Sequence, residues 1–208
     1  MAHMKELEMS KVVVFTNLTL DGVMQAPGRR DEDLRGGFQH GGWATPYAAM
    51  TSSEAGESLP NFDALLLGRR TYEDFYAYWP KQTDNPFTEV LNHMQKYVAS
   101  TTLEEPLAWS NSTLLKGDVP EAVGGLKAQP GKDVVVMGSG ELIQTLMKHN
   151  LVDRYVLLIH PLVLGSGRHL FTDGGAFAAL HLVSAKATPN GVVVATYEPA
   201  ESMAGKPT

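Results

Sequence analysis

The sequence predicts an α/β domain of three layers, in which helices cover a central, mostly parallel sheet that ends in a C-terminal antiparallel hairpin. Between residues 11 and 160, apolar β-branched runs alternate with segments of helical periodicity, and this alternation favours parallel strands joined by helical crossovers. Towards the C-terminus, two alternating segments flank Thr188-Pro-Asn-Gly191, which has the composition of a hairpin turn. The hairpin is expected to add an antiparallel edge to the sheet.

The elements follow from local patterns. The first strand is expected at 11–18, where KVVVFTNL is apolar and β-branched. Further strands are expected at 62–67, 95–100, 134–137, from 152 onward, 180–187 and 192–198. Helices are expected at 46–58, 69–79, 86–94, 119–128 and after Gly140. Thr45 and Pro46 have the residue types of an N-cap and first helical position, and 25–42 is expected to be a long loop, which in a compact domain is often functional.

The amino-acid composition argues against several classes of protein and of functional site. The chain has 208 residues, a net charge of −6, no cysteine and no cluster of basic residues, so we expect neither a disulfide or thiol site nor a nucleic-acid surface. No apolar run approaches the ~18 residues of a membrane span. We expect one domain at 10–199, an N-terminal extension or tag remnant at 1–9, a flexible tail at 200–208, and a cytoplasmic location.

Three strand ends carry small, hydroxyl and charged residues, at 68–71, 100–102 and 138–141. Parallel strands end at the same edge of a sheet, where ligands bind in open α/β folds. The glycine turn at 138–140 leads into a helix, whose N-terminus attracts phosphate. For each motif taken alone, turn and cap chemistry is the favoured explanation, but the joint occurrence of the three motifs favours a phosphorylated dinucleotide. A Rossmann fingerprint is excluded, because Ile143 stands where its third glycine is needed.

The chain resembles the dihydrofolate reductase-like superfamily. It is most similar to the reductase domain of bacterial riboflavin biosynthesis, the C-terminal domain of the bifunctional deaminase-reductase, and to its stand-alone relatives. The resemblance covers most of the domain, in family order. The matching segments are VVVFTNLTLDGVMQAPG (12–28), DALLLGRRTYEDF (63–75), KYVAST (96–101), VVVMGSGELIQTL (134–146) and LVDRYVLLIHPLVLGSGRHLF (151–171).

The resemblance implies NADPH as the hydride donor. Three groups of residues are implied to bind it: Leu18, Gly22, Val23 and Met24 around the nicotinamide; Gly68, Arg69, Arg70 and Thr71 with Ser100 and Thr101 near the adenosine 2′-phosphate; and Gly138, Ser139, Gly140, Glu141, Leu142 and Ile143 at the pyrophosphate. An arginine pair also favours NADPH over NADH, because a guanidinium binds phosphate in a bidentate manner.

The sequence also offers candidates for the catalytic and substrate-binding residues. Asp21 is the candidate catalytic residue, or else it only fixes the turn that it forms with Gly22. The candidate substrate-binding residues are Trp43, Tyr76, Trp79 and His160; core packing of the aromatic rings and a structural histidine are the alternatives. Dihydrofolate reductases carry a substrate-binding acid on the first long helix. The acids of the expected helix 46–58 are Glu54 and Glu57, and neither aligns with it.

Together these features predict an NADPH-dependent reductase that transfers hydride to a small flat heterocycle of the ribosylamino-pyrimidine, pterin or folate type. Arg29, Arg30 and Arg35 are candidates for binding a phosphorylated substrate, or are solvated. By resemblance we expect a homodimer that involves the C-terminal strands. The alternative function is a non-catalytic nucleotide-binding module of the same fold. No metal site is expected.

Overall fold

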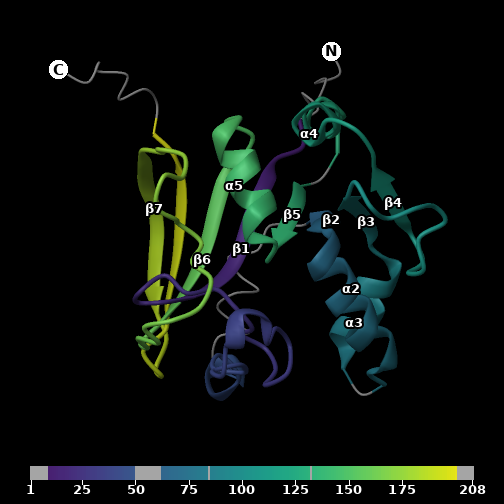
Figure 1. The fold of residues 1–208 in the computed structure, drawn as a ribbon. Coiled ribbons are helices and arrows are strands. Elements are labelled where there is room, and N and C mark those ends of the chain that lie inside the picture. The colour runs from purple at the N-terminus through teal and green to yellow at the C-terminus, as the bar shows by residue number, and fades with distance from the viewer. Residues whose placement is uncertain (1–8, 50–61, 84, 132, 201–208) are drawn as a thin grey trace, which may run out of the picture.

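A computed structural model describes residues 9–49, 62–83, 85–131 and 133–200. Eight strands of this part of the chain form one sheet in the order β4-β3-β2-β5-β1-β6-β8-β7 (Figure 1). Their bounds are β1 Val12–Thr19, β2 Phe62–Gly68, β3 Gln95–Ala99, β4 Ser112–Leu115, β5 Asp133–Met137, β6 Arg154–His160, β7 Leu180–Ala187 and β8 Val193–Pro199. Neighbouring strands are parallel from β4 to β6, and β8 is antiparallel to both β6 and β7. The predicted fold class is confirmed.

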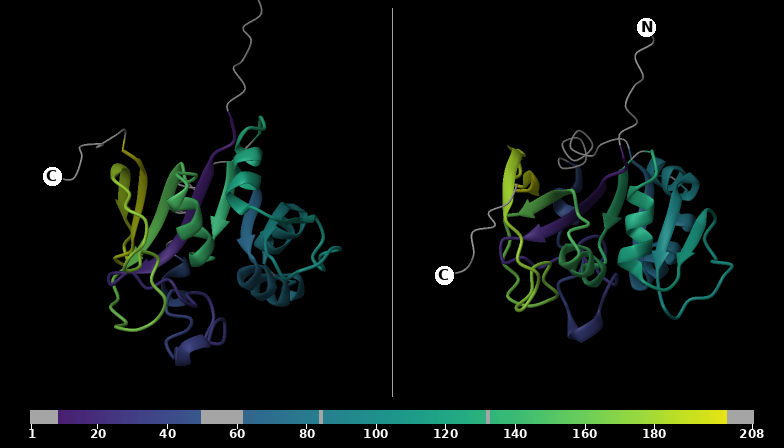
Figure 2. Two further views of the ribbon diagram at one scale, coloured as in Figure 1. Left: turned by 45° about the horizontal axis from the view of Figure 1, so that its top comes forward. Right: turned by 90° about the horizontal axis from the view of Figure 1, so that it is seen from above.

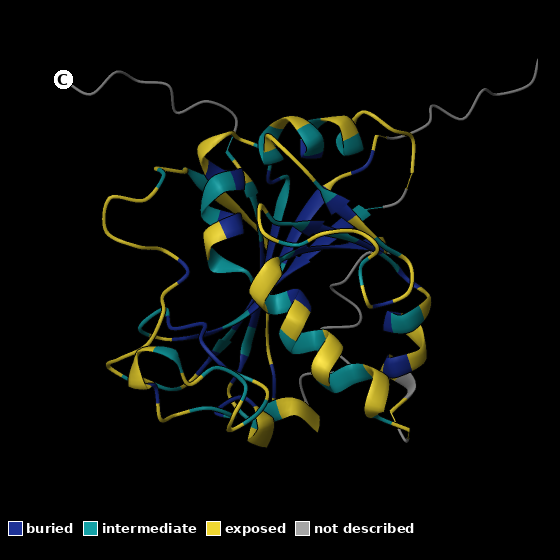
Figure 3. Cartoon of the chain, turned by 45° about the vertical axis from the view of Figure 1, so that its right-hand side comes forward, coloured by how far each residue is buried: buried dark blue, intermediate teal, exposed yellow. Residues whose placement is uncertain are grey.

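Helices cover the two faces of this sheet. The α-helices of the described residues are α2 Arg69–Tyr78, α3 Pro86–His93, α4 Val119–Lys127 and α5 Gly140–Lys148, and short 3-10 turns are η1 Arg35–Gly37, η2 Thr45–Tyr47 and η3 Trp79–Lys81. One core cluster packs α4 and α5 on the even-numbered valines of β1, and another packs α2 and α3 on the opposite face. This arrangement gives three layers, seen from two further sides in Figure 2. The central strands are buried, while the helices expose their outer sides (Figure 3).

The central crossover follows directly from the sequence pattern. β5 is a run of valines, and both β5 and β6 pair in parallel with β1. The helix between them buries Leu142, Ile143, Leu146 and Met147, which recur at the spacing of one helical face. The predicted strand, glycine turn, helix and strand of this crossover are therefore all confirmed.

Two expectations differ from the structure. The expected helix 46–58 begins as a 3-10 turn that has Ala44 at its N-cap position and continues as α-helix at residues 48–49, and the Thr45 hydroxyl donates to the carbonyl of Gly28 instead of capping the helix. Most of that helix, with Glu54 and Glu57, lies outside the described residues. The second difference is β4, which the sequence analysis missed, because a strand of four residues is recognisable only from its pairing with β3.

Two loops close the sheet at its carboxyl edge. The segment after β1 runs antiparallel to the segment after β6, with a bridge between Val23 and His169. The Met24 amide donates to the carbonyl of Arg168 at 2.8 Å. This pairing carries the loop after β6 to the ends of the parallel strands. No helix within the described ranges is long and apolar enough to cross a membrane.

Candidate functional site

A cavity of about 1090 Å³ opens at the carboxyl ends of β1, β2, β3 and β5. This volume is slightly above the usual range of small-molecule and cofactor sites, about 300–1,000 Å³. The segments that line it come from every part of the fold: 15–17, 24–27, 32–33, Arg35, 68–71, 74–75, 99–102, Val119, 137–142, 144–145, Lys148, 167–169 and Thr172. The three strand ends singled out in the sequence thus meet at one hollow.

Two helix N-termini face this cavity without a side-chain cap. The N-cap residues are Gly68 for α2 and Ser139 for α5, and neither helix has a capping side-chain hydrogen bond among the described residues. The first backbone N–H groups of a helix have no partner within the helix, and the macrodipole makes this end partly positive. Two such ends in one cavity provide unused donors for more than one phosphate group.

Ser139 joins the two N-termini. Its Oγ donates to Oγ1 of Thr71 and accepts from the amide of Gly68, both at 2.8 Å. The residue has φ 63° and ψ 57°, a left-handed conformation that costs a non-glycine residue roughly 1–2 kcal/mol. A Cβ on Gly68 would lie 3.2 Å from this Oγ, so a larger residue there would push the Ser139 side chain away by a few tenths of an ångström.

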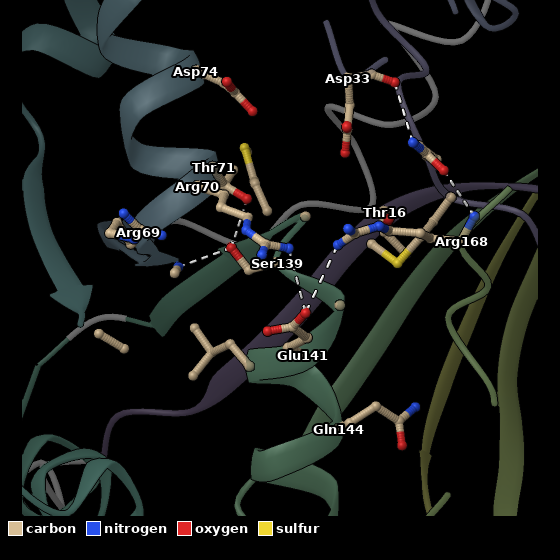
Figure 4. Close-up of a pocket in the computed structure, with 18 of the residues that line it drawn as sticks. Thr16, Asp33, Arg69, Arg70, Thr71, Asp74, Ser139, Glu141, Gln144 and Arg168 are labelled. Atoms are coloured by element: carbon tan, nitrogen blue, oxygen red, sulfur yellow. Dashed lines mark hydrogen bonds and ion pairs between the residues drawn. The ribbon is translucent and has the colours of Figure 1, made fainter. Parts of the chain in front are cut away.

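Cations gather around the N-terminus of α5 (Figure 4). The Glu141 carboxylate lies 3.5 Å from Nη1 of Arg70 and 3.8 Å from Nη1 of Arg168. Arg69, also at the cavity, lies 3.9 Å from Glu73 of its own helix. An anion bound at the N-terminus of α5 would therefore meet the guanidinium groups of Arg70 and Arg168, and Glu141 would compete with it for both.

Gln25 fixes the wall that carries Arg168. The side chain is buried, and its Nε2 donates to the carbonyls of Asp33 and Arg35 at 3.2 and 2.9 Å. Its Oε1 accepts from the amide of Arg168 at 3.0 Å. The sequence analysis missed Gln25 and Arg168, because their contact joins loops 143 residues apart.

Carboxylates lie across the cavity from α5. Arg35 binds Asp33 through two hydrogen bonds of 2.6 and 2.8 Å and lies 3.5 Å from Asp74. Burial raises the pKa of Asp74 and of Glu32, whereas hydrogen bonds from Arg35 outweigh the opposing effect of burial and lower the pKa of Asp33. Figure 4 shows Asp33 and Asp74 on opposite walls. Because Arg35 is paired with two carboxylates, little of its charge remains for a phosphorylated substrate.

The other two arginines considered for such a substrate are Arg29 and Arg30, and the cavity lining does not include them. The Arg29 guanidinium stacks 4.2 Å from the ring centroid of Tyr78 and lies 3.7 Å from Asp31. Arg30 is exposed.

The expected cofactor residues divide into two sets. Those that line the cavity are Met24, Gly68, Arg69, Arg70, Thr71, Ser100, Thr101, Gly138, Ser139, Gly140, Glu141 and Leu142. Leu18 and Ile143 lie in the core instead, and Gly22 and Val23 lie in the paired loop behind Met24. The Met24 sulfur would be 2.9 Å from a Cβ on Gly140, so Met24 packs against the N-terminus of α5.

Asp21 lies outside the residues that line the cavity. Its carboxylate accepts hydrogen bonds from the Thr19 hydroxyl and from the amides of Leu164 and Gly165, the last at 2.7 Å. The Thr19 bond first, and the two amides after it, lower the pKa of Asp21 to about 2. Through these contacts the carboxylate holds the loop after β6 against the end of β1.

The four expected substrate residues are also absent from the cavity lining. Trp43 is buried and donates from Nε1 to the carbonyl of Gln25. Tyr76 stacks on Tyr72, and Trp79 packs against Phe75 and Phe87. His160 is buried behind the cavity-lining Asn17.

Other side chains that line the cavity are not among the expected site residues: Phe15, Asn17, Asp74 and Phe75. A signal for two of them was present. Asp74 and Phe75 follow Thr71 by three and four residues, so they share its face of the helix. Once Thr71 is placed at a ligand, this spacing brings Asp74 and Phe75 to it.

The comparisons with known proteins agree with this fold. The family model described as the RibD C-terminal domain matches residues 10–194. The uncharacterized protein YyaP of Bacillus subtilis (strain 168) is 35% identical over 144 residues, which cover 67% of this chain and 75% of YyaP.

Two solved structures show the same fold at low sequence identity. A pyrimidine reductase-like protein from Corynebacterium diphtheriae has a TM-score of 0.64 at 13% identity and covers 93% of each chain. Dihydrofolate reductase from Enterococcus faecalis, complexed with NADP(H) and RAB-propyl, has a TM-score of 0.58 at 12% identity and covers 92% of this chain and 97% of its own. The resemblance inferred from the sequence is confirmed, and the chain belongs to the RibD C-terminal domain family.

Proposed function

We propose that this protein is an NADPH-dependent reductase that transfers hydride to a small flat heterocycle. One observation carries the proposal: two uncapped helix N-termini, joined through Ser139, face a single cavity that also holds Arg69, Arg70 and Arg168. Reductase-like relatives with the same fold support the choice of a nicotinamide cofactor.

The residues present fit the phosphates of NADPH. The amides at the start of α5 and the guanidinium of Arg168 would hold the pyrophosphate. Arg69, Arg70 and Thr71 would hold the 2′-phosphate, with Ser100 and Thr101 on the neighbouring loop. Ser100 Oγ accepts from the amides of Thr102 and Leu103 at 3.1 and 3.0 Å and lies 3.4 Å from Oγ1 of Thr102. When bound, NADPH supplies the hydride.

The part of the cavity between β1 and α2 suits a flat substrate. Phe15 and Phe75 provide apolar surface there, and Asn17 and Asp74 provide polar groups. Burial raises the pKa of Asp74, because the carboxylate is partly removed from water. Hydrogen bonds from the N–H groups of a heterocycle would compensate for this loss of solvation. We propose a pyrimidine, pterin or folate type of substrate, and we assign Asp21 to loop positioning because its contacts are with the backbone of 164–165.

Calorimetry and absorbance at 340 nm test this function. We expect NADPH to bind at least tenfold more tightly than NADH, and we expect NADPH oxidation with one member of a panel of dihydrofolate, dihydropterin and a ribosylamino-pyrimidine. Equal affinity for the two cofactors would contradict the role of the arginines. Tight NADPH binding without turnover across the panel would instead support the non-catalytic nucleotide-binding module.

We also propose that the protein forms a homodimer through β7. This strand pairs with β8 on one side and forms the edge of the sheet on the other. Leu182 and Val183 are 54% and 49% exposed on it, and an exposed apolar edge strand is a surface for pairing with another chain. Sedimentation should show a dimer at micromolar concentration, and Leu182→Lys should shift it to monomer; a monomeric wild type would refute the proposal. We place the protein in the cytoplasm, which cell fractionation would test.

A further inference from the structure

A buried histidine lies directly behind the substrate end of the cavity. His160 ends β6 and is 1% exposed, and its Nε2 lies 2.9 Å from Oδ1 of Asn17 on the neighbouring strand β1. The rings of Trp43 and Tyr47 meet the imidazole edge-on, each at a centroid distance of 5.1 Å. Burial lowers the pKa of His160 to about 4, so the ring is neutral near pH 7 and carries a single N–H.

The surroundings decide which nitrogen carries that proton. Nδ1 of His160 is buried and has no hydrogen-bond partner among the described residues. Buried N–H groups without an acceptor are rare, whereas an unsatisfied acceptor is tolerated somewhat more often. The proton therefore belongs on Nε2, which donates to its hydrogen-bond partner in the described part of the chain, Oδ1 of Asn17.

This bond fixes the orientation of the Asn17 amide. With Oδ1 held by His160, the NH2 group of Asn17 points away from the imidazole. Asn17 is half-buried and lines the cavity, on the same face of β1 as Phe15. Among the described residues, the recorded hydrogen bond of this side chain uses Oδ1 alone and leaves Nδ2 as an unused donor.

We propose that Asn17 donates from Nδ2 to an acceptor atom of the flat ring bound at this end of the cavity, and that His160 is the positioning residue that holds the Asn17 amide in the donating orientation. The inference rests on the proposed function. The acceptor is a carbonyl oxygen or ring nitrogen, either on the substrate or on the carboxamide of the nicotinamide. The site thereby selects rings with an acceptor at this edge and disfavours rings that present N–H there.

Variants at the two positions separate positioning from packing. His160→Gln keeps an N–H donor close to the position of Nε2, whereas His160→Phe keeps a ring but removes the donor. Asn17→Ala removes the group that contacts the ligand. If His160 acts only through Asn17, the double variant Asn17→Ala/His160→Phe binds ligand no worse than Asn17→Ala alone.

The test combines one spectroscopic and two binding measurements on the full chain. A long-range ¹H–¹⁵N spectrum should show His160 protonated at Nε2. Asn17→Ala and His160→Phe should each weaken binding about five- to tenfold, the loss expected for one hydrogen bond, with His160→Gln within about twofold of wild type. If Asn17→Ala binds NADPH more weakly than wild type but binds 2′-phospho-ADP-ribose, which lacks the nicotinamide, equally well, the acceptor is on the cofactor. An increase in substrate KM at unchanged NADPH affinity would place it on the substrate.

Several results would overturn this inference. The first is a His160 imidazole that is protonated at Nδ1. The second is a loss of ligand affinity in the double variant that equals the sum of the two single losses. The third is an Asn17→Ala variant whose NADPH affinity and substrate KM equal those of wild type. Thermal melts of each variant check that the fold is retained, and His160→Gln serves as the matched control if His160→Phe fails to fold. A wild type that binds no NADPH refutes the proposed function, whereas a wild type that binds it beside an unaffected Asn17→Ala refutes only the role of Asn17.

Discussion

The hydroxyl groups of Ser139 and Thr71 lie 2.8 Å apart and connect the start of α5 to the start of α2. The same Ser139 oxygen accepts from the amide of Gly68, so a single side chain sets the spacing between two helix N-termini. Ser139 does this from a left-handed backbone conformation. Strain of this kind persists where surrounding contacts over-determine it, and it concentrates at ligand sites.

Ser139→Ala should reduce both stability and cofactor binding. The variant loses two hydrogen bonds but keeps the left-handed backbone, so we expect unfolding free energy to fall by about 1–3 kcal/mol and NADPH to bind about tenfold more weakly. Ser139→Gly is the matched control, because it loses the same bonds while relieving the strain. It should therefore be more stable than Ser139→Ala by about 1 kcal/mol in urea melts. Equal stability of the two variants would show that the conformation is not strained.

Glu141→Gln should strengthen NADPH binding. The carboxylate of Glu141 lies between Arg70 and Arg168, and removing its charge frees both guanidinium groups for phosphate. The side chain is well exposed, so the gain is limited to about two- to fivefold at low salt and should shrink as salt increases. Calorimetry at two salt concentrations measures it, with Glu121→Gln in the first turn of α4 as the control. A weaker complex would mean that Glu141 itself binds the cofactor.

The parts of the fold that can be predicted from the sequence are those encoded by short, continuous segments. The valine run of β5, the turn at 138–140 and the apolar face of α5 each occupy fewer than ten residues, so the crossover is visible in the sequence. The strand β4 is not predicted, because its four residues contain no such pattern.

In the candidate site, too, locally encoded features can be predicted and long-range contacts cannot. The carboxyl end of a strand can be predicted from the point where an apolar run stops, and the residues at 68–71, 100–102 and 138–141 that follow such runs all line the cavity. Arg168 and Asn17 depend instead on strand and loop pairing across more than 140 residues, which no local pattern encodes. The aromatic residues chosen as substrate contacts have the right chemistry, but helix rotation points Phe75 rather than Tyr76 to the cavity.

Lys96→Met should destabilise the protein. Lys96 in β3 is fully buried, and its Nζ donates to the carbonyls of Leu91 and Met94 at 2.7 Å each while lying 4.5 Å from the ring centroid of Trp109. Methionine fills a similar volume but leaves the carbonyls at the end of α3 without their donor, which should cost about 2 kcal/mol.

Chemical denaturation of Lys96→Met measures this loss, and Lys148→Met on α5 controls for removal of a lysine charge. Burial lowers the pKa of Lys96 to about 8, below the ordinary value near 10.4. The unfolded chain therefore holds more protons between these values, and wild-type stability should gain a contribution as pH rises through this window. Lys96→Met should lack that gain. A variant as stable as wild type would show that the carbonyls find other partners.

His160 should make stability depend on pH in the acidic range. Its folded pKa is about 4, because burial disfavours the imidazolium, while the unfolded value is near 6.5. Between these values the unfolded chain binds a proton that the folded chain does not, so this contribution is fully present above about pH 6.5 and is lost as pH falls towards 4. The pKa difference corresponds to a loss on the order of 3 kcal/mol.

Carboxylates titrate in the same range, so the measurement has to be a difference between two proteins. The rings that face the imidazole edge-on are those of Trp43 and Tyr47. His160→Gln cannot take up the proton, so its unfolding free energy should fall less than that of wild type between pH 6.5 and 4.5. Parallel curves for the two proteins would mean that the folded imidazole accepts a proton at its ordinary pKa. The neutral, Nε2-protonated ring that orients Asn17 would then predominate only above about pH 6.5.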